Sequence, residues 1–382
     1  MAPVIKALQK RSHLFDVVTV VTGQHREMLR QVLGLFDIVP DDDLDIMRET
    51  QSLTDITTRC LVGLESVFFG YQPDLVFVHG DTTTTLAAAL AAYYQQIPVG
   101  HVEAGLRTYD RYQPFPEEMN RVLTDHLSEL HFAPTWSNQQ QLEKEGAKRD
   151  TIFVTGNTAI DALLAITSPD HPFTHDSLRA RPWKDRALIL CDVHRRENFG
   201  RPLSQIARGL RRLVAAHPDS YLVLSVHPNP AVREVMESVF SSQERVLKIA
   251  PLDYADWANL MNQARFIVTD SGGLQEEAPA LGVPVLLARK KTERPEAVAA
   301  GTVKLVGTDE QAVFDMGARL LTEDSLHKAM ASRRNPYGDG RAADRIVQAV
   351  AWYWGKGERP LPPFSDSPGS PSEDLDSSGA LP

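Results

Sequence analysis

The sequence contains little cysteine: Cys60 and Cys191 are the two cysteines among 382 residues. They lie far apart in apolar surroundings, so a disulfide framework is excluded and both are expected to be reduced core residues. No run of residues is long and apolar enough to span a membrane, and Met1–Lys6 lacks the pattern of a signal peptide. These absences favour a cytoplasmic protein without a membrane partner.

An excess of basic residues is also absent, because 40 Lys and Arg face 50 Asp and Glu, for a net charge of −10. This balance does not indicate a nucleic-acid partner, although it allows a local anion site. The histidines are scattered without the spacing of a zinc site, so we expect no metal. The sequence has no G-x-G-x-x-G motif, so we expect no dinucleotide, and we expect no other cofactor. It also lacks a G-x-S-x-G or Cys–His signature, so we expect neither a serine nor a cysteine nucleophile.

The chain is long enough to bury large cores, and its hydrophobic share of 42% makes two domains the natural expectation. Short apolar strands alternate with helical patterns, which predicts an α/β fold with parallel sheets covered by helices. So many strands fit two doubly wound domains better than one. The expected strands are Val17–Val21, Leu75–Val78, Val99–Val102, Ile152–Thr155, Leu188–Cys191, Leu222–Val226, Val246–Ile249, Phe266–Thr269, Val283–Leu287 and Val303–Val306, and the expected helices include Leu86–Gln95, Leu203–Ala216 and Leu274–Leu281.

Breaker residues mark the expected boundary between the domains at Thr167–Arg186. The segment 355–382 is rich in Pro, Ser, Gly and acids, and is expected to be disordered because it cannot bury enough apolar surface. Met1–Arg11 is predicted to be a helix, yet it precedes the first visible strand. A doubly wound domain normally begins with a strand, so this chain starts one strand late.

Two motifs follow expected buried strands: HGDTTTT at 79–85 and HVEAGLRT at 101–108. Ligands of open α/β sheets bind outside the carboxyl ends of the strands, so two acids, two histidines and an arginine are expected at one cleft edge. Asp81 and Glu103 can act as base and partner, because different surroundings separate their pKa values. In the alternative interpretation, Asp81 caps the following helix and Glu103 pairs with Arg107.

Two further charged segments are candidates for the same cleft. PFPEEMNR places Glu117 and Glu118 in a first helical turn, where acids are favourable with or without a role in the cleft. HRREN follows the strand at 188–191 and contains His194, a candidate proton carrier, and Arg195, a candidate ligand of phosphate or carboxylate. The alternative is a solvated run of charges.

His227 ends the next strand and is expected to border that cleft. Ser271, Gly272 and Gly273 join another expected strand to a helix, and glycines let backbone amides approach a phosphate at a helix N-terminus. The alternative there is an ordinary tight turn. Glu277 could bind ribose hydroxyls, and Arg294 adds a second anion contact. Together, these segments predict a nucleotide diphosphate held by the second domain and facing the acids of the first.

The chain resembles the bacterial non-hydrolysing UDP-N-acetylglucosamine 2-epimerases over roughly residues 1–354. Several motifs carry the resemblance together and make it specific. They are HGDTTTT (79–85), HVEAGLRT (101–108), PFPEEMNR (114–121), VTGNTAIDAL (154–163), HRREN (194–198), TDSGGLQEEAP (269–279), TERPEAV (292–298) and NPYGDG (335–340).

The resemblance implies two Rossmann-like domains arranged as in nucleotide-sugar transferases, here 1–167 and 168–341, with a helix at 342–354 that returns to the first domain. It also implies that UDP-N-acetylglucosamine and UDP-N-acetylmannosamine are interconverted for cell-surface polysaccharide precursors. In the family mechanism, UDP is eliminated to give 2-acetamidoglucal and re-adds with C2 inverted. A homodimer is the usual expectation for the family.

The resemblance also assigns roles to residues. The catalytic residues are expected to be Asp81, Glu103, Glu117 and His194, with proton transfer at C2 given to the Asp81/Glu103 pair and departure of UDP assisted by His194. The residues expected to bind UDP are Ser271, Gly272, Gly273, Glu277, Arg294 and Trp257. UDP-N-acetylglucosamine is expected also as an allosteric activator, bound by Gln24, His25, Gln51, Glu117, Arg195 and His227.

The sequence departs from the family pattern in three ways. An opening strand and its G-T-R-P-E-A-I-K loop are absent, so we expect the natural product to start upstream of Met1. Glu27 and Thr50 stand where the family's activator site usually has Gln and Arg, and Trp257 stands where Phe often contacts the uracil. Three other functions stay open: a glycosyltransferase of the same fold, a UDP-sugar-binding protein without turnover, and a hydrolysing 2-epimerase.

Overall fold

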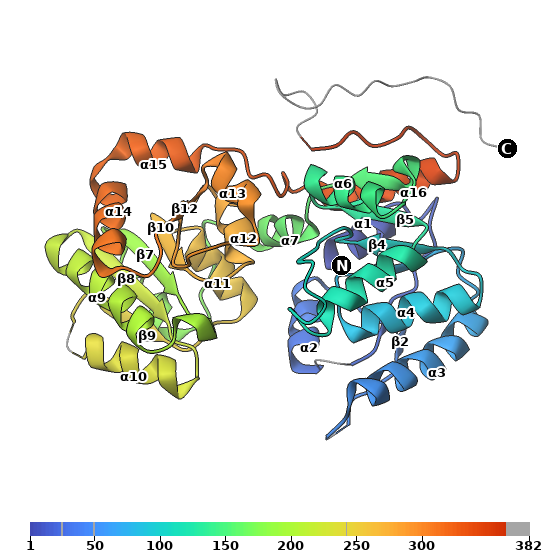
Figure 1. Cartoon of the computed structure of the whole chain (residues 1–382), viewed down its shortest axis with the longest axis horizontal. Coiled ribbons are helices and arrows are strands. Elements are labelled where there is room, and N and C mark those ends of the chain that lie inside the picture. Colours follow the sequence, from blue (N-terminus) through green and yellow to red (C-terminus); the bar gives the residue numbers. More distant parts are fainter. Residues whose placement is uncertain (24–25, 49, 242, 364–382) are drawn as a thin grey trace.

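The computed structural model describes residues 1–23, 26–48, 50–241 and 243–363. Within these residues the chain forms two lobes, each built on a parallel sheet (Figure 1). We name them by their sheets: the first lobe holds β3–β6 and the second lobe holds β7–β12. The described helices include none that combines the length and the apolar character needed to cross a bilayer. The predicted α/β fold with two parallel-sheet lobes is therefore confirmed.

The first lobe contains a four-stranded sheet in the order β3-β4-β5-β6, and a separate pair of short strands, β1 and β2. Within the described residues β3 is an edge strand, because β1 pairs with β2 and not with β3. The elements of this lobe are α1 (Ala2–Gln9), β1 (Val20–Val21), α2 (Arg26–Leu35), β2 (Asp42–Asp43), α3 (Leu53–Tyr71), β3 (Val76–His79), α4 (Thr83–Tyr94), β4 (Val99–Val102), α5 (Glu117–Leu127), β5 (Leu130–Ala133), α6 (Trp136–Lys144), η1 (Arg149–Thr151), β6 (Ile152–Val154), α7 (Thr158–Ile166) and α16 (Ala342–Tyr353).

The second lobe contains a six-stranded sheet in the order β12-β11-β10-β7-β8-β9. The chain builds outward from β7 in one direction and then returns to β10 and builds in the other. Its elements are α8 (Asp176–Arg179), β7 (Ala187–Asp192), η2 (Arg196–Asn198), α9 (Arg201–Ala216), β8 (Ser220–Ser225), α10 (Pro230–Val239), β9 (Val246–Ile249), α11 (Tyr254–Met261), β10 (Phe266–Thr269), α12 (Leu274–Ala280), β11 (Val285–Leu287), α13 (Pro295–Ala300), β12 (Val303–Leu305), α14 (Glu310–Thr322) and α15 (Asp324–Ala331).

Each sheet is covered on both faces, which explains why its strands read as apolar runs and not as alternating patterns. In the second lobe, Leu190 faces one apolar cluster while its neighbours Ile189 and Cys191 face another on the opposite side. In the first lobe, α3 and α4 contribute to one cluster, and α1 and α16 to another (Figure 1). The cores therefore fix the strands and leave the loops at their carboxyl ends available for a site.

Two details differ from the sequence-based predictions. The strand Leu130–Ala133 was not predicted, because it has only four residues and one of them is His131. Its position between β4 and β6 buries it completely, and the His131 ring is bonded to the Asp125 carbonyl at 2.9 Å. The predicted strand Val17–Val21 is reduced to Val20–Val21, since β1 pairs with the very short β2.

Residues that follow the second lobe return to the first lobe. Helix α16 packs against α1 and α7, and the Asp161 carboxylate accepts hydrogen bonds from Ala342 N at 3.1 Å and Ala343 N at 2.8 Å. Beyond α16, the guanidinium of Arg359 lies over the Phe153 ring at 4.6 Å. Of the segment expected to be disordered, 355–363 is described and 364–382 lies outside the described residues.

Candidate active site

The loops at the carboxyl ends of the strands carry most of the predicted site residues. In the first lobe, Asp81 follows β3 and Glu103 follows β4. In the second lobe, His194 follows β7 and Ser271 follows β10, the two neighbouring strands from which the chain leaves in opposite directions. Such a reversal of strand order opens a crevice where open α/β sheets bind ligands.

Asp81 is held by α5. Its Oδ2 atom lies 2.8 Å from a nitrogen of Arg121, whose side chain is 9% exposed, and its backbone carbonyl accepts a hydrogen bond from Asn120 at 2.9 Å. Burial raises the pKa of the Asp81 carboxyl, while the Arg121 guanidinium opposes this shift and Glu117 adds to it. The alternative in which Asp81 caps α4 is wrong, because the cap is Thr82, whose side chain accepts from Thr85 N.

Glu103 has a different environment. Its backbone is left-handed, with φ +69°, a conformation that is uncommon outside glycine and concentrates at functional sites. Its carboxyl Oε2 lies 3.7 Å from His79 Nε2, and Oε1 accepts a hydrogen bond from Asn157 at 3.4 Å. Burial, together with the nearby carboxylate of Glu276, raises the pKa of Glu103 to about 7.

Two residues of HVEAGLRT, His101 and Arg107, have buried side chains that pair with other residues of the first lobe. The ring of His101 is fully buried, with Nδ1 2.6 Å from Asp125 Oδ1 and Nε2 2.8 Å from the Gly80 carbonyl. Arg107 pairs with Asp125 at 2.7 Å and with Glu145 at 2.5 Å. The expectation that two histidines and this arginine reach one cleft edge is therefore corrected, and so is the alternative pairing of Glu103 with Arg107. The side chains of His101 and Arg107 hold the loops that carry Asp81 and Glu103.

The two acids of PFPEEMNR have different environments. Glu118 is buried, and its Oε1 accepts hydrogen bonds from Thr108 N and Tyr109 N, both at 2.9 Å. Glu117 begins α5 and faces Asp81 closely enough to raise the pKa of that carboxyl. Glu118 therefore holds the loop after β4, while Glu117 is the acid of the pair on the side of Asp81.

The loop after β7 is held by Asp270, which accepts hydrogen bonds from His194 N at 3.0 Å and Arg195 N at 2.9 Å. The His194 ring stacks on the His227 ring, with centroids 5.5 Å apart, and its Nδ1 lies 3.2 Å from Asp192. The hydrogen bond to Asp192 raises the pKa of His194. The structure thus brings His194 and His227 together, as the sequence predicted, and favours the protonated imidazole.

The Ser-Gly-Gly turn lies against Arg294. A side chain at Gly272 would approach both a terminal nitrogen of Arg294 and a carboxyl oxygen of Glu293 within 3.1 Å, and these two groups are themselves paired at 3.3 Å, so the close packing of this ion pair on the turn requires glycine. Ser271 N donates to Thr269 Oγ1 at 3.0 Å, while Gly273 precedes α12. Gly272 is buried and Gly273 is exposed, so the turn places a cationic side chain close to one exposed backbone position, an arrangement that suits an anion.

Two further predicted UDP ligands belong to the second lobe. Glu277 lies on α12, where burial and the neighbouring Glu276 raise its pKa to about 7. Trp257 lies on α11, half-buried against the apolar cluster that also contains Leu274. Both positions fit binding through a carboxyl and an aromatic ring, and their roles stay predictions.

The predicted activator ligands of the first lobe are placed only in part. Gln24 and His25 lie outside the described residues. The carbonyl oxygen of Gln51 accepts hydrogen bonds from Arg48 N and from the Arg59 side chain, both at 3.2 Å. In the second lobe, Arg195 lies 3.7 Å from Glu293.

A contact across the two lobes was missed by the sequence analysis. The side-chain amide of Asn157, at the start of α7, donates to Glu276 Oε2 on α12 at 2.8 Å, and the same nitrogen lies 3.4 Å from Glu103. Glu276 is also bonded to Arg294 Nε at 2.6 Å. The motifs VTGNTAIDAL and TDSGGLQEEAP contain these residues, but only the fold shows that they meet. Asn120 and Arg121 were missed for the same reason.

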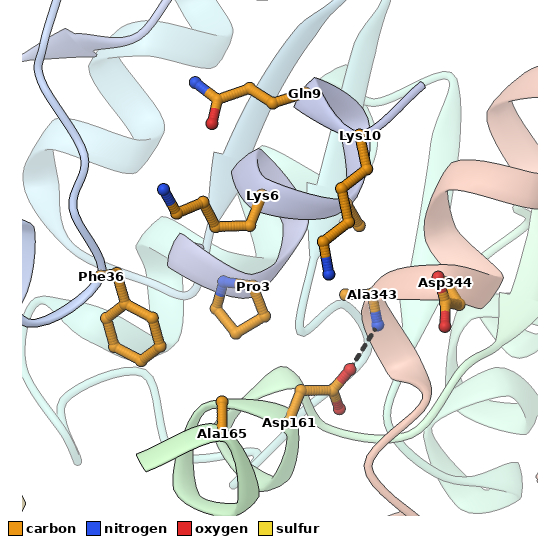
Figure 2. A pocket seen from close by; sticks show the side chains of 10 residues that line it. Pro3, Lys6, Gln9, Lys10, Phe36, Asp161, Ala165, Ala343 and Asp344 are labelled. Carbon is orange, nitrogen blue, oxygen red and sulfur yellow. Dashed lines mark hydrogen bonds between the residues drawn. The ribbon is translucent and has the colours of Figure 1, made fainter. Parts of the chain in front are cut away.

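A cavity of about 530 Å³ lies away from the predicted catalytic residues, among α1, α7 and α16 (Figure 2). Its lining includes Lys6 and Lys10 on α1, Asp161 on α7 and Asp344 on α16. Asp161 is already bonded to the N-terminus of α16, and Lys6 donates to the Asp37 carbonyl at 2.9 Å. These partners give the charged groups of the cavity a structural role.

Comparisons with known proteins agree with this geometry. A family model described as UDP-N-acetylglucosamine 2-epimerase matches residues 6–351. The chain is 51% identical over 357 residues to the UDP-N-acetylglucosamine 2-epimerase of Escherichia coli K12, covering 92% of this chain and 94% of that protein. It is 50% identical over 355 residues to the UDP-N-acetylglucosamine 2-epimerase of Bacillus subtilis, covering 93% and 92%.

A solved structure leads to the same family. The UDP-GlcNAc 2-epimerase of Neisseria meningitidis, bound to UDP-GlcNAc, superposes with a TM-score of 0.78 at 45% identity, covering 92% of this chain and 96% of that one. The sequence match and the structural match each span almost the whole chain. The chain belongs to the UDP-N-acetylglucosamine 2-epimerase family.

Proposed function

We propose that the protein is a non-hydrolysing UDP-N-acetylglucosamine 2-epimerase, which interconverts UDP-N-acetylglucosamine and UDP-N-acetylmannosamine for cell-surface polysaccharide precursors. Its membership of the family and the names of its relatives in Escherichia coli and Bacillus subtilis support this activity. The free, buried Cys60 and Cys191 fit the reducing cytoplasm.

The observation that carries the proposal is the unequal environment of Asp81 and Glu103. Asp81 is paired with the Arg121 guanidinium, which favours its carboxylate. Glu103 is bonded to a neutral amide, and its pKa of about 7 means that the protonated and ionised forms are both well populated near neutral pH. Two carboxyls held in different protonation states can exchange a proton with opposite faces of one carbon.

The reaction then proceeds through elimination and re-addition. One carboxylate takes the C2 proton while the C1–O bond breaks, its electron pair leaves with UDP, and a C1–C2 double bond forms to give 2-acetamidoglucal. The other carboxyl returns a proton to the opposite face of C2, and UDP re-forms the C1–O bond. No oxidant or cofactor is needed. Glu117 acts beside Asp81, whose pKa it raises.

The second lobe is proposed to bind UDP. Arg294 and the backbone at Ser271, Gly272 and Gly273 stabilise the charge of the diphosphate. Protonated His194, favoured by Asp192, assists departure of the UDP oxygen. Glu277 binds the ribose, and Trp257 contacts the uracil.

We further propose that a second UDP-N-acetylglucosamine binds as an activator between the lobes. Arg195 and His227 in the second lobe and Glu117 in the first are the described ligands with the clearest access, because their loops border the catalytic groups. Gln51 completes the described set, and Gln24 and His25 belong to it by the family resemblance.

A homodimer is proposed through one face of the first lobe. Helices α3 and α4 pack together, and four large side chains on them are exposed: Val62 at 62%, Phe69 at 78%, Tyr93 at 58% and Tyr94 at 70%. Clusters of exposed apolar and aromatic side chains typically mark protein interfaces. A second copy of this chain is the partner that the family expectation supports.

The domain boundaries also stay a proposal: 1–167 and 168–341, with 342–354 returning to the first domain. The separate sheets β3–β6 and β7–β12 support this division, and so does the packing of α16 on α1.

Product analysis with UDP-N-acetylglucosamine tests the function and separates its alternatives. The proposal predicts UDP-N-acetylmannosamine without net release of UDP. Free N-acetylmannosamine with stoichiometric UDP would instead indicate a hydrolysing epimerase. Binding of UDP without any product would indicate a binding protein, and transfer of the sugar to an added acceptor would indicate a glycosyltransferase.

A further inference from the structure

We propose that Asn157 and Glu276 are positioning residues for Glu103, so that the second lobe sets the orientation of a catalytic carboxyl that belongs to the first. This inference deepens the proposed function and rests on it, since it takes Glu103 as one of the two groups that act at C2.

The amide of Asn157 has one orientation. Its Oδ1 accepts from Ala159 N at 2.9 Å, as the cap of α7, and its backbone N donates to the Tyr337 carbonyl at 2.7 Å. With the oxygen occupied, the Nδ2 group and its two hydrogens are directed to Glu276 and Glu103, at 2.8 and 3.4 Å. The side chain is therefore a fixed donor to both carboxyls.

Glu276 is equally fixed. One carboxyl oxygen accepts from Arg294 Nε at 2.6 Å and the other accepts from Asn157, while its backbone carbonyl accepts from Asn335 at 2.7 Å. The side chain of Glu276 is 7% exposed, and both its oxygens meet donors, which is the hydrogen-bonding pattern of a carboxylate. A carboxyl group paired with Arg294 is thus held one amide away from Glu103.

Glu103 is surrounded by several charged or titratable groups. The groups that face it are His79 at the end of β3, Asp81, His101 on β4, Glu276 on α12, Arg294 before α13 and the Met1 amino group beside α1. Among the acids, Glu276 acts more strongly on Glu103 than Asp81 does, and both favour the protonated carboxyl. The amide of Asn157 acts in the opposite sense, because donating to a carboxylate stabilises the ionised form.

Asn157 and Glu276 act in opposite directions on the ionisation of Glu103. Substitutions at the two positions should therefore shift it in opposite directions, which a merely structural role would not produce. Glu276→Gln removes the negative charge and should lower the midpoint at which Glu103 ionises, by about one pH unit. Asn157→Ser keeps a side chain that can cap α7 but removes the Nδ2 amide group that donates to Glu103 and Glu276, so the midpoint should rise. The matched control is Glu293→Gln. It removes a carboxylate that lies 3.3 Å from the same Arg294 but is not bonded to Asn157.

The midpoint can be read without catalysis, by carbon NMR of protein labelled at the glutamate carboxyl, with the Glu103 signal assigned from its absence in Glu103→Gln. The inference is supported if Glu276→Gln lowers the midpoint, Asn157→Ser raises it and Glu293→Gln leaves it near the wild-type value. An unchanged midpoint in either test variant, in protein that unfolds at the wild-type temperature, overturns it. If one variant fails to fold, the other decides.

Kinetics then separate positioning from binding. For UDP-N-acetylglucosamine, Asn157→Ser should lower kcat by about tenfold or more and change KM little, because misplacement of a reacting group acts on the chemical step. A rise in KM alone would contradict the inference. If the wild type catalyses no exchange at C2, the proposed function fails, whereas the NMR midpoints still decide whether Asn157 and Glu276 act on Glu103.

Discussion

At the scale of single residues, the proposed proton transfer at C2 depends on a pair of carboxyl groups with different partners. Asp81 and Glu103 are both carboxyls after neighbouring strands, yet one is paired with Arg121 and the other is bonded to the neutral amide of Asn157. The difference comes from α5, which carries Arg121, and from the N-terminal cap of α7, which is Asn157. We therefore expect the environment of each carboxyl, and not its residue type, to assign the acid and the base.

Replacing the partner of Asp81 tests this division. Arg121→Met should reduce kcat by about tenfold to a hundredfold, because the Asp81 carboxyl loses both its orientation and the charge that favours its ionised form. Steady-state kinetics on UDP-N-acetylglucosamine give the value. Arg149→Met is the matched control, since that side chain is 75% exposed and lies 3.7 Å from Glu143. Equal activity of the two variants would contradict a role for Arg121.

The raised pKa of Glu103 predicts a pH dependence of stability. In the folded chain the pKa is about 7, above its ordinary value of 4.5, so the folded protein keeps a proton that the unfolded chain loses between these values. Stability therefore falls as pH rises through this window. Glu103→Gln removes the effect, and relative to the wild type it should gain roughly 1–3 kcal/mol between about pH 5 and about pH 8.

Chemical denaturation at several pH values measures this gain. Glu237→Gln serves as the control, because its side chain is 63% exposed. A Glu103→Gln variant whose stability runs parallel to that of the wild type over the whole range would show that Glu103 ionises normally.

At the scale of elements, close packing of α9 against α14 depends on small residues. A side chain at Gly209 would meet the Glu310 carbonyl at 2.7 Å, and one at Gly317 would meet Leu213 at 2.6 Å. We predict that Gly209→Ala destabilises the protein by about 1–3 kcal/mol, because α14 must move away. Gly34→Ala, at an open helical position of α2, should be neutral or stabilising. Thermal unfolding distinguishes the two, and equal melting temperatures would contradict the packing argument.

Elements were predictable from the sequence where burial leaves a long apolar signature. The six strands of the second lobe were all predicted, because each is a predominantly apolar segment between turn signals, although β9 and β12 each contain a lysine. The strand Leu130–Ala133 was missed because four residues containing His131 do not differ from a loop in isolation. Its histidine is tolerated because the Asp125 carbonyl lies within hydrogen-bonding distance.

The residues of the site were predictable where a motif ends a strand, as at Asp81, Glu103, His194 and Ser271. The contact among Asn157, Glu276 and Glu103 was not, because these residues come from three elements in two lobes and no local pattern relates them. His101 and Arg107 show the reverse error. They share a motif with Glu103, but His101 on β4 and Arg107 in the loop that follows are both paired with the buried Asp125.

At the scale of the whole molecule, the exposed face of α3 and α4 predicts an assembly. Phe69→Asp should convert a homodimer to a monomer, because it places a charge at the most exposed of the aromatic side chains on that face. Light scattering after size-exclusion chromatography measures the mass. Val39→Asp is the control, since Val39 is 83% exposed and belongs to neither of these helices. A wild-type protein that is monomeric at micromolar concentration would contradict the prediction.

The central proposal concerns both lobes. Acids of the first lobe act at C2 of the sugar, while the second lobe holds the diphosphate of the same UDP-sugar. Proton NMR of UDP-N-acetylglucosamine in deuterated water, with this protein added, tests it most directly. We predict that deuterium replaces the proton at C2 as UDP-N-acetylmannosamine forms, and that Asp81→Asn and Glu103→Gln each suppress the exchange. Formation of the epimer with the C2 proton retained would contradict it.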